Sequence, residues 1–323
     1  MTRSIDVVTF GETMLRLSSP GFGRLEEAVS LDVRVGGSES NTAVALARLG
    51  LKAAWWSKLP DNPLGRRIEN EIRRWGVDTS ATLWDASPTS RAGLYFLDFG
   101  LPPRGTDVYY DRAASSASKI TALEVEASPI GSARLLHLTG ITPALSPYAL
   151  KATTRALELA RSARTPISFD INYRSKLWSP QTAREALEPM LGQVDLLLCP
   201  LSDAESIFDI HGDGFTTAQE FQSRYDVPAV VITMGGEGAV AIDSRGRYFV
   251  KPYELRGVVD RVGAGDAFNA GLLMGYLDNN LEEGLRYGVA MAALKHTIPG
   301  DLLLSPRAEI DVAVAGNANS INR

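Results

Sequence analysis

Residues 260–268, with the sequence Asp-Arg-Val-Gly-Ala-Gly-Asp-Ala-Phe, carry the pattern in this chain that most strongly indicates chemistry. Gly263, Ala264 and Gly265 predict a tight turn, and the apolar run after Asp266 predicts a buried helix. Backbone N–H groups at the start of a helix lack intrahelical acceptors and carry partial positive charge, so the turn would bind an anion such as phosphate. Asp266 would then take a proton from a hydroxyl group as it attacks the bound phosphoryl group.

Two other interpretations of this turn stay open at this point. The first is that Asp266 only caps the helix, a position that aspartate favours. The second is a dinucleotide-binding loop of the form G-x-G-x-x-G. It fits less well, because Phe268 stands at the third glycine position and the motif comes late in the chain.

Short apolar runs alternate with amphipathic stretches along the chain, and this alternation predicts the strands and helices that position the turn. We predict strands at 7–10, 53–58, 135–139, 167–171, 194–199 and 229–233, and helices at 41–49, 64–75, 147–163 and 182–191. Such an alternation predicts a mostly parallel sheet with helices on both faces. Ligands bind beyond the carboxyl ends of such strands, where Asn172, Arg174, Ser202, Glu205 and Gly235 stand.

Two segments interrupt the alternation, residues 13–35 and 91–112, and each carries short alternating strands with no helix between them. The second suits a hairpin that turns between Gly100 and Gly105. We interpret the two segments as a small β-sheet that covers the active site as a lid. An edge extension of the main sheet is the alternative. Unpaired strands in such a lid favour a homo-oligomer that assembles through it.

Composition excludes several classes of protein. The 323 residues carry a net charge of −5, which disfavours a nucleic-acid partner or an anionic membrane surface. Cys199 is the only cysteine, so an intrachain disulfide is excluded, and the three histidines have no metal-ligand spacing. No apolar run approaches the length that spans a membrane, which favours a cytoplasmic protein. Residues 313–323 are small and polar and predict a disordered tail.

With these pieces placed, the chain resembles the ribokinase-like (PfkB) family of sugar kinases over its whole length. Four motifs carry the resemblance in the expected order: Gly36-Gly37-Ser38-Glu39-Ser40-Asn41, Leu59-Pro60-Asp61-Asn62-Pro63-Leu64-Gly65, Thr233-Met234-Gly235-Gly236-Glu237-Gly238, and Asp260-x-x-Gly263-Ala264-Gly265-Asp266. The resemblance implies a single α/β domain over residues 1–323. Its three layers would be a mostly parallel sheet between helices, with a small β lid.

The resemblance also implies ATP-dependent phosphorylation of a primary hydroxyl group. Asp266 would be the base, and the N–H groups of the Gly263–Ala264–Gly265 turn would form the anion hole. The nucleotide side would include Ser202, Thr233, Gly235 and Gly238, together with Gly263 and Gly265. Mg²⁺ would bridge the ATP phosphates, with Glu205 holding metal-bound water. Ser202 stands where the family usually has asparagine, and Pro60 where it usually has glycine.

Two basic residues indicate which class of substrate the chain binds. Arg112 and Arg174 stand at the lid and at a strand end, and a bidentate arginine suits a carboxylate better than a neutral sugar. Within the family the pattern resembles 2-keto-3-deoxygluconate kinases. That resemblance implies a substrate site made of Gly36, Gly37, Asn41, Tyr95, Tyr110, Arg112, Arg174 and Asp301. The product would be 2-keto-3-deoxy-6-phosphogluconate.

Each of these residues also has a purely structural interpretation. The arginines would make ordinary ion pairs, the tyrosines would pack in a sheet, and Asp301 would belong to a turn after Gly300. Other activities also stay open: a kinase for a neutral sugar such as fructose, a kinase for another 2-keto-3-deoxy acid such as the galactonate epimer, and a sugar-binding regulator without catalysis. Retention of Asp266 disfavours the regulator, because binding alone needs no base.

Overall fold

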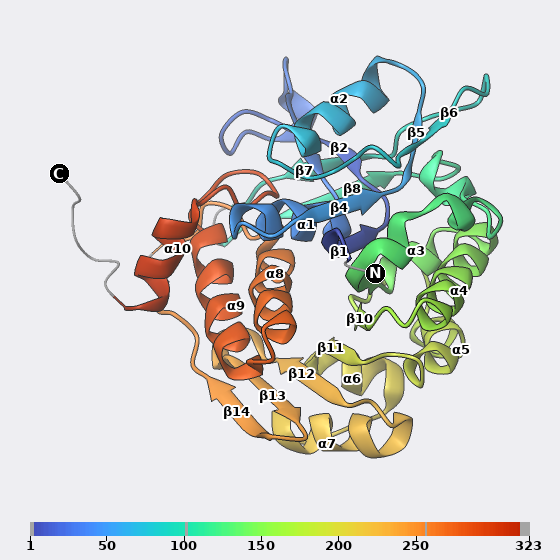
Figure 1. The fold of residues 1–323 in the computed structure, drawn as a ribbon. Coiled ribbons are helices and arrows are strands. Elements are labelled where there is room, and N and C mark those ends of the chain that lie inside the picture. Colours follow the sequence, from blue (N-terminus) through green and yellow to red (C-terminus); the bar gives the residue numbers. More distant parts are fainter. Residues whose placement is uncertain (1–2, 101–102, 256, 317–323) are drawn as a thin grey trace.

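Eight strands form a twisted sheet at the centre of the molecule (Figure 1). The structure is a computed structural model that describes residues 3–100, 103–255 and 257–316. In spatial order the strands are β14 (Gly246–Val250), β13 (Ala239–Asp243), β12 (Ala229–Thr233), β11 (Leu196–Pro200), β10 (Ile167–Asp170), β9 (Ala133–Thr139), β1 (Ile5–Phe10) and β4 (Ala53–Trp56). The strands from β12 to β4 pair in parallel, which confirms the mostly parallel sheet that the sequence predicts.

The sheet ends in an antiparallel hairpin, which the sequence analysis did not predict. β13 pairs antiparallel with both β12 and β14, and Asp243 lies opposite Gly246 in the register. Only two residues connect β13 to β14, and a parallel connection needs a crossover of a dozen or more.

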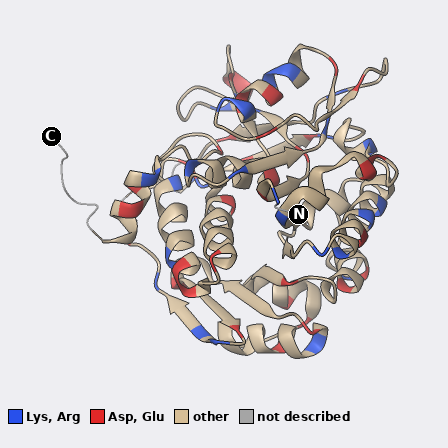
Figure 2. Cartoon of the chain, viewed as in Figure 1, with Lys and Arg blue, Asp and Glu red and all other residues tan. Residues whose placement is uncertain are grey.

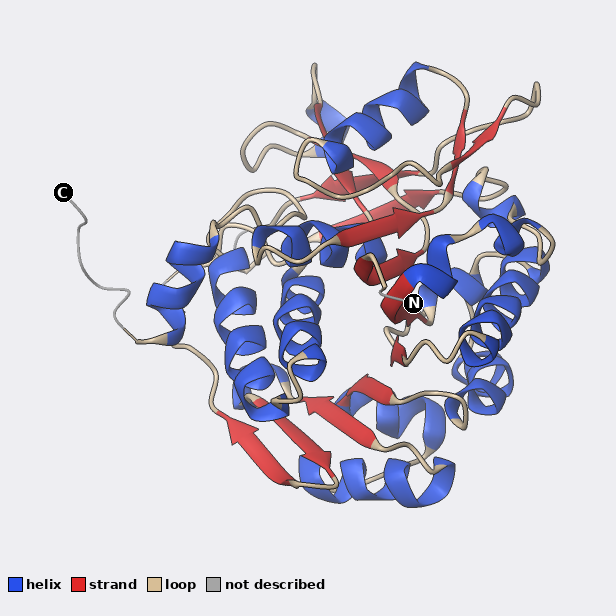
Figure 3. Ribbon diagram, viewed as in Figure 1, coloured by secondary structure: helices blue, strands red, loops and turns tan. Residues whose placement is uncertain are grey.

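Helices cover both faces of the sheet, and strands and helices separate into layers in Figure 3. The helices are α1 (Ser38–Arg48), α2 (Pro63–Arg73), α3 (Ile141–Ala144), α4 (Pro147–Ser162), α5 (Pro180–Leu191), α6 (Leu201–Phe208), α7 (Gly214–Tyr225), α8 (Ala264–Leu277), α9 (Leu281–Lys295) and α10 (Arg307–Val314). Short 3₁₀ turns lie at Leu25–Glu27, Ala117–Lys119, Glu124–Ala127, Pro129–Ser132 and Gly235–Glu237. Basic and acidic residues are interspersed over the outer helices (Figure 2).

In most strands of the main sheet, alternate residues contribute to two hydrophobic cores, one on each face of the sheet. Val7 and Leu135 belong to the core under α1, α8 and α9, whereas their neighbours Val8 and Leu136 belong to the core under α4 and α5. This division follows from the two-residue period of a strand that is buried on both faces. The two cores hold the carboxyl ends of the strands at one edge, where the polar residues gather.

A second sheet of four strands projects from the main one, at the top of Figure 1. Its order is β3 (Asp32–Gly36), β2 (Met14–Ser18), β7 (Leu94–Asp98) and β8 (Asp107–Asp111). β5 (Lys58–Pro60) and β6 (Leu83–Asp85) form a separate parallel pair. The four-stranded sheet comes from the two segments expected to form a lid, so the edge-extension alternative is wrong. Tyr109 and Val33 are exposed on it, and assembly through this sheet stays a prediction.

The chain ends differ in part from the expectation. The predicted tail at 313–323 overlaps α10, in which Ala313 is buried, while 317–323 lie outside the described residues. Among the described residues, no helix combines the length and the apolar character needed to cross a membrane.

Candidate active site

The predicted Gly-Ala-Gly turn does open a helix. Gly263 is the N-cap of α8 and has φ +85°, a left-handed conformation that glycine adopts without strain. A Cβ atom at Gly263 would lie 1.9 Å from the carbonyl oxygen of Asp301, so only glycine allows the turn to approach that residue. A Cβ at Gly265 would meet nothing within 4 Å. The first turn of α8 therefore has open space beside Gly265, and the N–H groups at a helix start are the donors that an anion site uses.

Asp266 lies in the first turn of α8 and is buried. The Ser38 hydroxyl donates to its Oδ1 at 2.6 Å, and the Asn41 amide donates to its Oδ2 at 2.7 Å. Burial raises the pKa of Asp266, while these two hydrogen bonds and the charge of Arg174 oppose the rise. Both oxygens are thus fixed by α1, which does more than a helix cap requires. Ser38 is not among the residues predicted for the site, although it directly follows the glycine pair.

A second buried carboxyl group is connected to Asp266 through side chains. Asn172 donates to the Ser38 hydroxyl at 3.0 Å and to Asp170 Oδ2 at 3.2 Å. Asn269 donates to the same oxygen of Asp170 at 2.8 Å. Burial raises the pKa of Asp170 to about 7, against the lowering effect of the Asn269 hydrogen bond. This polar chain joins the end of β10 to the starts of α1 and α8.

Asp301 belongs to a buried ionic cluster on the lid side. Arg16 donates to Asp301 Oδ1 and to Asp260 Oδ2, both at 2.6 Å, and the Tyr95 hydroxyl donates to Asp301 Oδ2 at 2.5 Å. Arg16 is 1% exposed. A Cβ at Gly36 would lie 2.2 Å from Asp301 Oδ2, which explains the glycine there. The cluster fixes the orientation of Asp301, and Arg16 is not among the residues predicted from the sequence.

The two predicted carboxylate-binding arginines differ in their surroundings. Arg112 is buried, and its Nε and Nη2 donate to Glu12 Oε2 at 2.8 and 2.5 Å. Arg174 is exposed, and its one hydrogen bond in the described chain goes from Nη1 to the Tyr173 carbonyl at 3.3 Å. Arg112 therefore offers its remaining N–H groups from a fixed position, and Arg174 is free to turn toward a ligand.

A single cavity of about 1130 Å³ brings the predicted residues together. Its wall includes all the predicted residues except Glu205: Gly36, Gly37, Asn41, Tyr95, Tyr110, Arg112, Arg174, Ser202, Thr233, Gly235, Gly238, Gly263, Ala264, Gly265, Asp266 and Asp301. Glu205 is exposed outside the wall. Asp203, on the same helix, lines the cavity instead, and burial raises the pKa of its carboxyl group.

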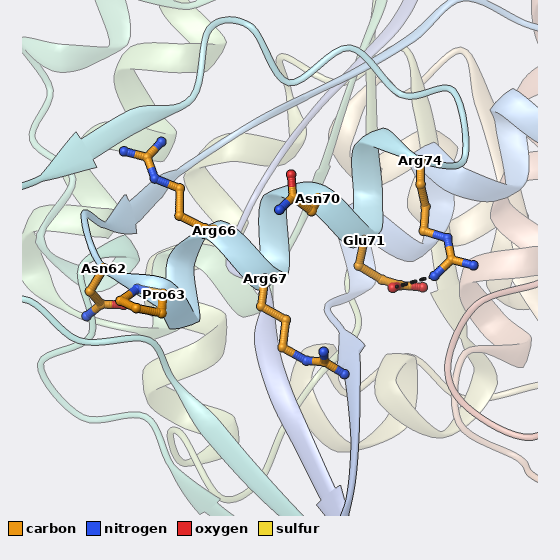
Figure 4. A pocket seen from close by; sticks show the side chains of 7 residues that line it. All are labelled: Asn62, Pro63, Arg66, Arg67, Asn70, Glu71 and Arg74. Carbon is orange, nitrogen blue, oxygen red and sulfur yellow. Dashed lines mark hydrogen bonds and ion pairs between the residues drawn. The ribbon is translucent and has the colours of Figure 1, made fainter.

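A second depression of about 710 Å³ lies along α2 (Figure 4). It carries three arginines, but Arg66 pairs with Asp61 at 2.5 Å and Arg74 with Glu71 at 3.2 Å. Arg67 donates to the carbonyl of Val33. Each of these guanidinium groups already has a partner among its neighbours on the surface.

Comparison with known proteins agrees with this geometry. The family model described as pfkB family carbohydrate kinase matches residues 4–306. The chain belongs to this family. It is 41% identical over 319 residues to a 2-dehydro-3-deoxygalactonokinase of Haloferax volcanii, covering 98% of this chain and 99% of that one. It is 33% identical over 305 residues to a 2-dehydro-3-deoxygluconokinase of Bacillus subtilis, covering 92% and 91%.

A solved structure shows the same fold. The crystal structure of 2-dehydro-3-deoxygluconokinase from Thermotoga maritima superposes with a TM-score of 0.90 at 34% identity, covering 97% of this chain and 98% of that one. The ribokinase-like fold and the resemblance to this group of sugar-acid kinases are therefore confirmed, and the chain is a carbohydrate kinase.

One buried acid of this kinase leads to a prediction about stability. Glu39, in the first turn of α1, accepts hydrogen bonds from Thr139 and Thr142 on Oε1 at 2.7 and 2.9 Å. Burial raises its pKa from 4.5 to about 7, although these hydrogen bonds oppose the rise. A raised folded-state pKa gives stability that is complete below about pH 4.5 and is lost as the pH rises through about 7.

We expect Glu39→Gln to raise the free energy of unfolding at pH 8 and to change it little at pH 5. A rise of the pKa from 4.5 to about 7 corresponds to a gain in the free energy of unfolding of up to about 3 kcal/mol at pH 8. Glutamine keeps the Oε1 acceptor without the buried charge. Urea unfolding at both pH values measures the effect, with Glu220→Gln on the surface of α7 as the control. The same difference at both pH values would contradict a raised pKa.

Proposed function

We propose that this kinase transfers the γ-phosphoryl group of ATP to the primary hydroxyl of 2-keto-3-deoxygluconate, the compound also called 2-dehydro-3-deoxygluconate. The product is 2-keto-3-deoxy-6-phosphogluconate. One observation carries the proposal. Asp266 has both oxygens held by Ser38 and Asn41 at the anion-binding start of α8, in a cavity whose wall also includes Arg112 and Arg174.

The chemistry is assigned to the first turn of α8. Asp266 takes the proton of the substrate hydroxyl, whose oxygen forms a bond to the γ-phosphorus as the bond to the β-phosphate oxygen breaks and ADP leaves. The N–H groups of Ala264, Gly265 and Asp266 stabilise the charge on the transferring phosphoryl group. Burial raises the pKa of Asp266 above that of an ordinary aspartate, which makes the carboxylate a stronger base.

The sugar acid is assigned to the lid side of the cavity. Arg174 and Arg112 bind the carboxylate, and Asp301 accepts hydrogen bonds from substrate hydroxyls. Tyr95 and Tyr110, with ring centroids 6.1 Å apart, form an aromatic wall. Gly36, Gly37 and Asn41 complete the site from the end of β3 and the start of α1. The sheet that carries the tyrosines closes over the substrate as a lid.

ATP is assigned to the opposite part of the cavity, where Ser202, Thr233, Gly235 and Gly238 line the wall. Open space beside Gly235, where a Cβ would meet nothing within 4 Å, leaves room for a ligand against the backbone.

The donor set also fits magnesium bound mainly through ATP. Among the described residues, no group of three or more acidic, histidine or cysteine side chains could hold a metal by itself. Mg²⁺ usually keeps several waters and takes one or two carboxylates besides nucleotide phosphates. Asp203 on the wall and Glu205 on the same helix would hold metal-bound water. When bound, the ion neutralises phosphate charge during transfer.

The galactonate epimer is a second candidate substrate. The relative that is 41% identical to this chain is named a 2-dehydro-3-deoxygalactonokinase, whereas the relatives at 33 and 34% are named for the gluconate compound. The two acids differ in the configuration of one hydroxyl group and share the carboxylate, so both can bind to Arg112 and Arg174 through it.

Coupled ATP turnover with Mg²⁺ tests the proposal. The substrates are 2-keto-3-deoxygluconate, its galactonate epimer, gluconate, fructose and ribose. We expect turnover with the 2-keto-3-deoxy acids and little with the neutral sugars, and the ratio of kcat/KM between the epimers decides which acid is preferred. A preference for fructose or ribose would overturn the sugar-acid assignment.

A further inference from the structure

Lys295, the last residue of α9, is a buried cation that the proposed chemistry does not use. Its side chain is 0% exposed. The Nζ ammonium donates to the carbonyl oxygen of Ile298 at 2.9 Å and to that of Asp260 at 3.4 Å. In the described chain both hydrogen bonds go to backbone carbonyls rather than to a carboxylate. A buried charge is costly, so a lysine held in this way calls for a role that an apolar side chain could not fill.

The charges around Lys295 explain how it stays in the interior. The carboxylates of Asp260, Asp301 and Asp266 favour its charged form, and Arg16 opposes it. Burial lowers the pKa of Lys295, and the carboxylates act against that effect. Arg16 pairs with Asp260 and Asp301 on one side of this region, and the Lys295 ammonium adds a second buried cation beside the same acids.

The two carbonyl groups belong to two loops that together frame the active site. One loop runs from Val259 to Gly263 and leads into α8, and the other runs from His296 to Asp301. The Val259 N–H donates to the His296 carbonyl at 2.8 Å, and the Gly300 N–H donates to Asp260 Oδ2 at 2.9 Å.

The loops meet again at their far ends, where Gly263 lies against the carbonyl oxygen of Asp301. Asp260 also controls the path of the first loop through its side chain, because its Oδ1 accepts the N–H of Val262 at 3.0 Å. A shift of the Asp260 peptide would therefore be transmitted to the turn that begins at Gly263.

We propose that the Lys295 ammonium is a built-in cation of the phosphoryl-transfer site, which binds the carbonyls of Asp260 and Ile298 and so fixes the Gly263–Asp266 turn against Asp301. Lys295 is a positioning residue, and its role rests on the assignment of that turn under the proposed function. Backbone carbonyl oxygens are also ligands of free monovalent cations such as potassium. An enzyme with its own cation at this position needs none from solution.

The experiment compares Lys295→Met, which keeps the apolar volume without the charge, with Lys295→Ala, which removes three methylene groups and the ammonium. Activity is measured with the sugar acid that the wild type turns over best, in choline buffer and after addition of potassium, n-propylammonium or 1-propanol. n-Propylammonium matches the atoms that the alanine variant lacks. 1-Propanol has a similar size without charge. Thermal unfolding shows that each variant is folded, and the exposed Lys52→Met is the matched control.

We expect Lys295→Met to lower kcat about 100-fold, because small displacements of catalytic groups cost that much. KM values should stay within about twofold of wild type. Lys295→Ala should recover activity with n-propylammonium or potassium, saturably, and not with 1-propanol. The wild type and Lys52→Met should not respond to added cations.

Three results would overturn the proposal: a folded Lys295→Met with wild-type kcat, a folded Lys295→Ala that no cation rescues, and equal rescue by 1-propanol. If Lys295→Met does not fold, the rescue of Lys295→Ala by added cations alone tests the proposal. If neither variant folds, Lys295 has only a structural role and the proposal is overturned. Asp266→Asn, assayed in parallel, separates the two assignments. Full turnover by Asp266→Asn would reject Asp266 as the base. Cation rescue of Lys295→Ala is measured separately and does not depend on that result.

Discussion

Asp266→Asn is expected to lower kcat about 10³-fold while ATP and the sugar acid still bind, because general base catalysis contributes on that scale. The asparagine keeps the shape and can accept from Asn41 and donate to the Ser38 hydroxyl, so the contacts to α1 survive. The substitution removes the ability to take a proton together with the negative charge. Steady-state kinetics measures kcat, and calorimetric titration measures the affinity for ATP and for the acid.

The same substitution at the other end of α8 provides the control. Asp278 is the exposed C-cap of that helix, and Asp278→Asn should leave kcat and both affinities unchanged. If Asp266→Asn loses binding along with turnover, the residue has a structural role at the helix start and the proposed base is wrong.

Arg174→Ala should raise KM for the sugar acid by about 10- to 100-fold, because a hydrogen bond to a charged group contributes about 1.5–3 kcal/mol. kcat and the KM for ATP should change little, since the carboxylate contact is the same in the ground state and the transition state. Arg174 is exposed and makes one hydrogen bond in the described chain, so its removal does not disturb the fold. Initial-rate kinetics over a range of acid concentrations measures the effect.

Arg174→Lys serves as the matched variant, because it keeps the charge but loses the planar pair of donors. It should give an intermediate KM. An unchanged KM in Arg174→Ala would remove Arg174 from the substrate site. Arg112 gives a less clear test, because its loss would leave Glu12 as a buried, unpaired carboxylate.

Much of the fold could be predicted because its elements have strong local signals. The helix predicted at 147–163 is α4, Pro147–Ser162, where Ser146 caps the first turn and proline follows it. α9 was not predicted. Its glycines, Gly284 and Gly288, disfavour an isolated helix and are explained only by close packing, since a Cβ at Gly284 would lie 2.8 Å from a carbonyl oxygen of α8. Such a helix is specified by its partner and not by its own residues.

The residues of the candidate site also fall into two groups, those with a local sequence signal and those without one. Asp266 and Asn41 could be found because each sits in a short motif at a helix start. Arg16 could not, because an arginine in an alternating strand predicts a solvent-facing side chain. The structure instead buries it between Asp260 and Asp301, more than 240 positions along the chain. Glu12 and Lys295 were missed for the same reason: their partners are defined only by tertiary structure.

The contacts of Asp266 have a consequence for synthesis of the chain on the ribosome. Ser38 and Asn41 are made early, whereas the carboxylate that they hold lies 228 and 225 positions later. β1, made first, lies between β9 and β4 and waits for β9 before both of its edges are paired. A nascent chain released before α8 has emerged therefore holds Ser38 and Asn41 but lacks Asp266 and the residues that α8 and α9 contribute to one of the two cores. Such truncated products are expected not to fold, because one face of the central sheet stays uncovered.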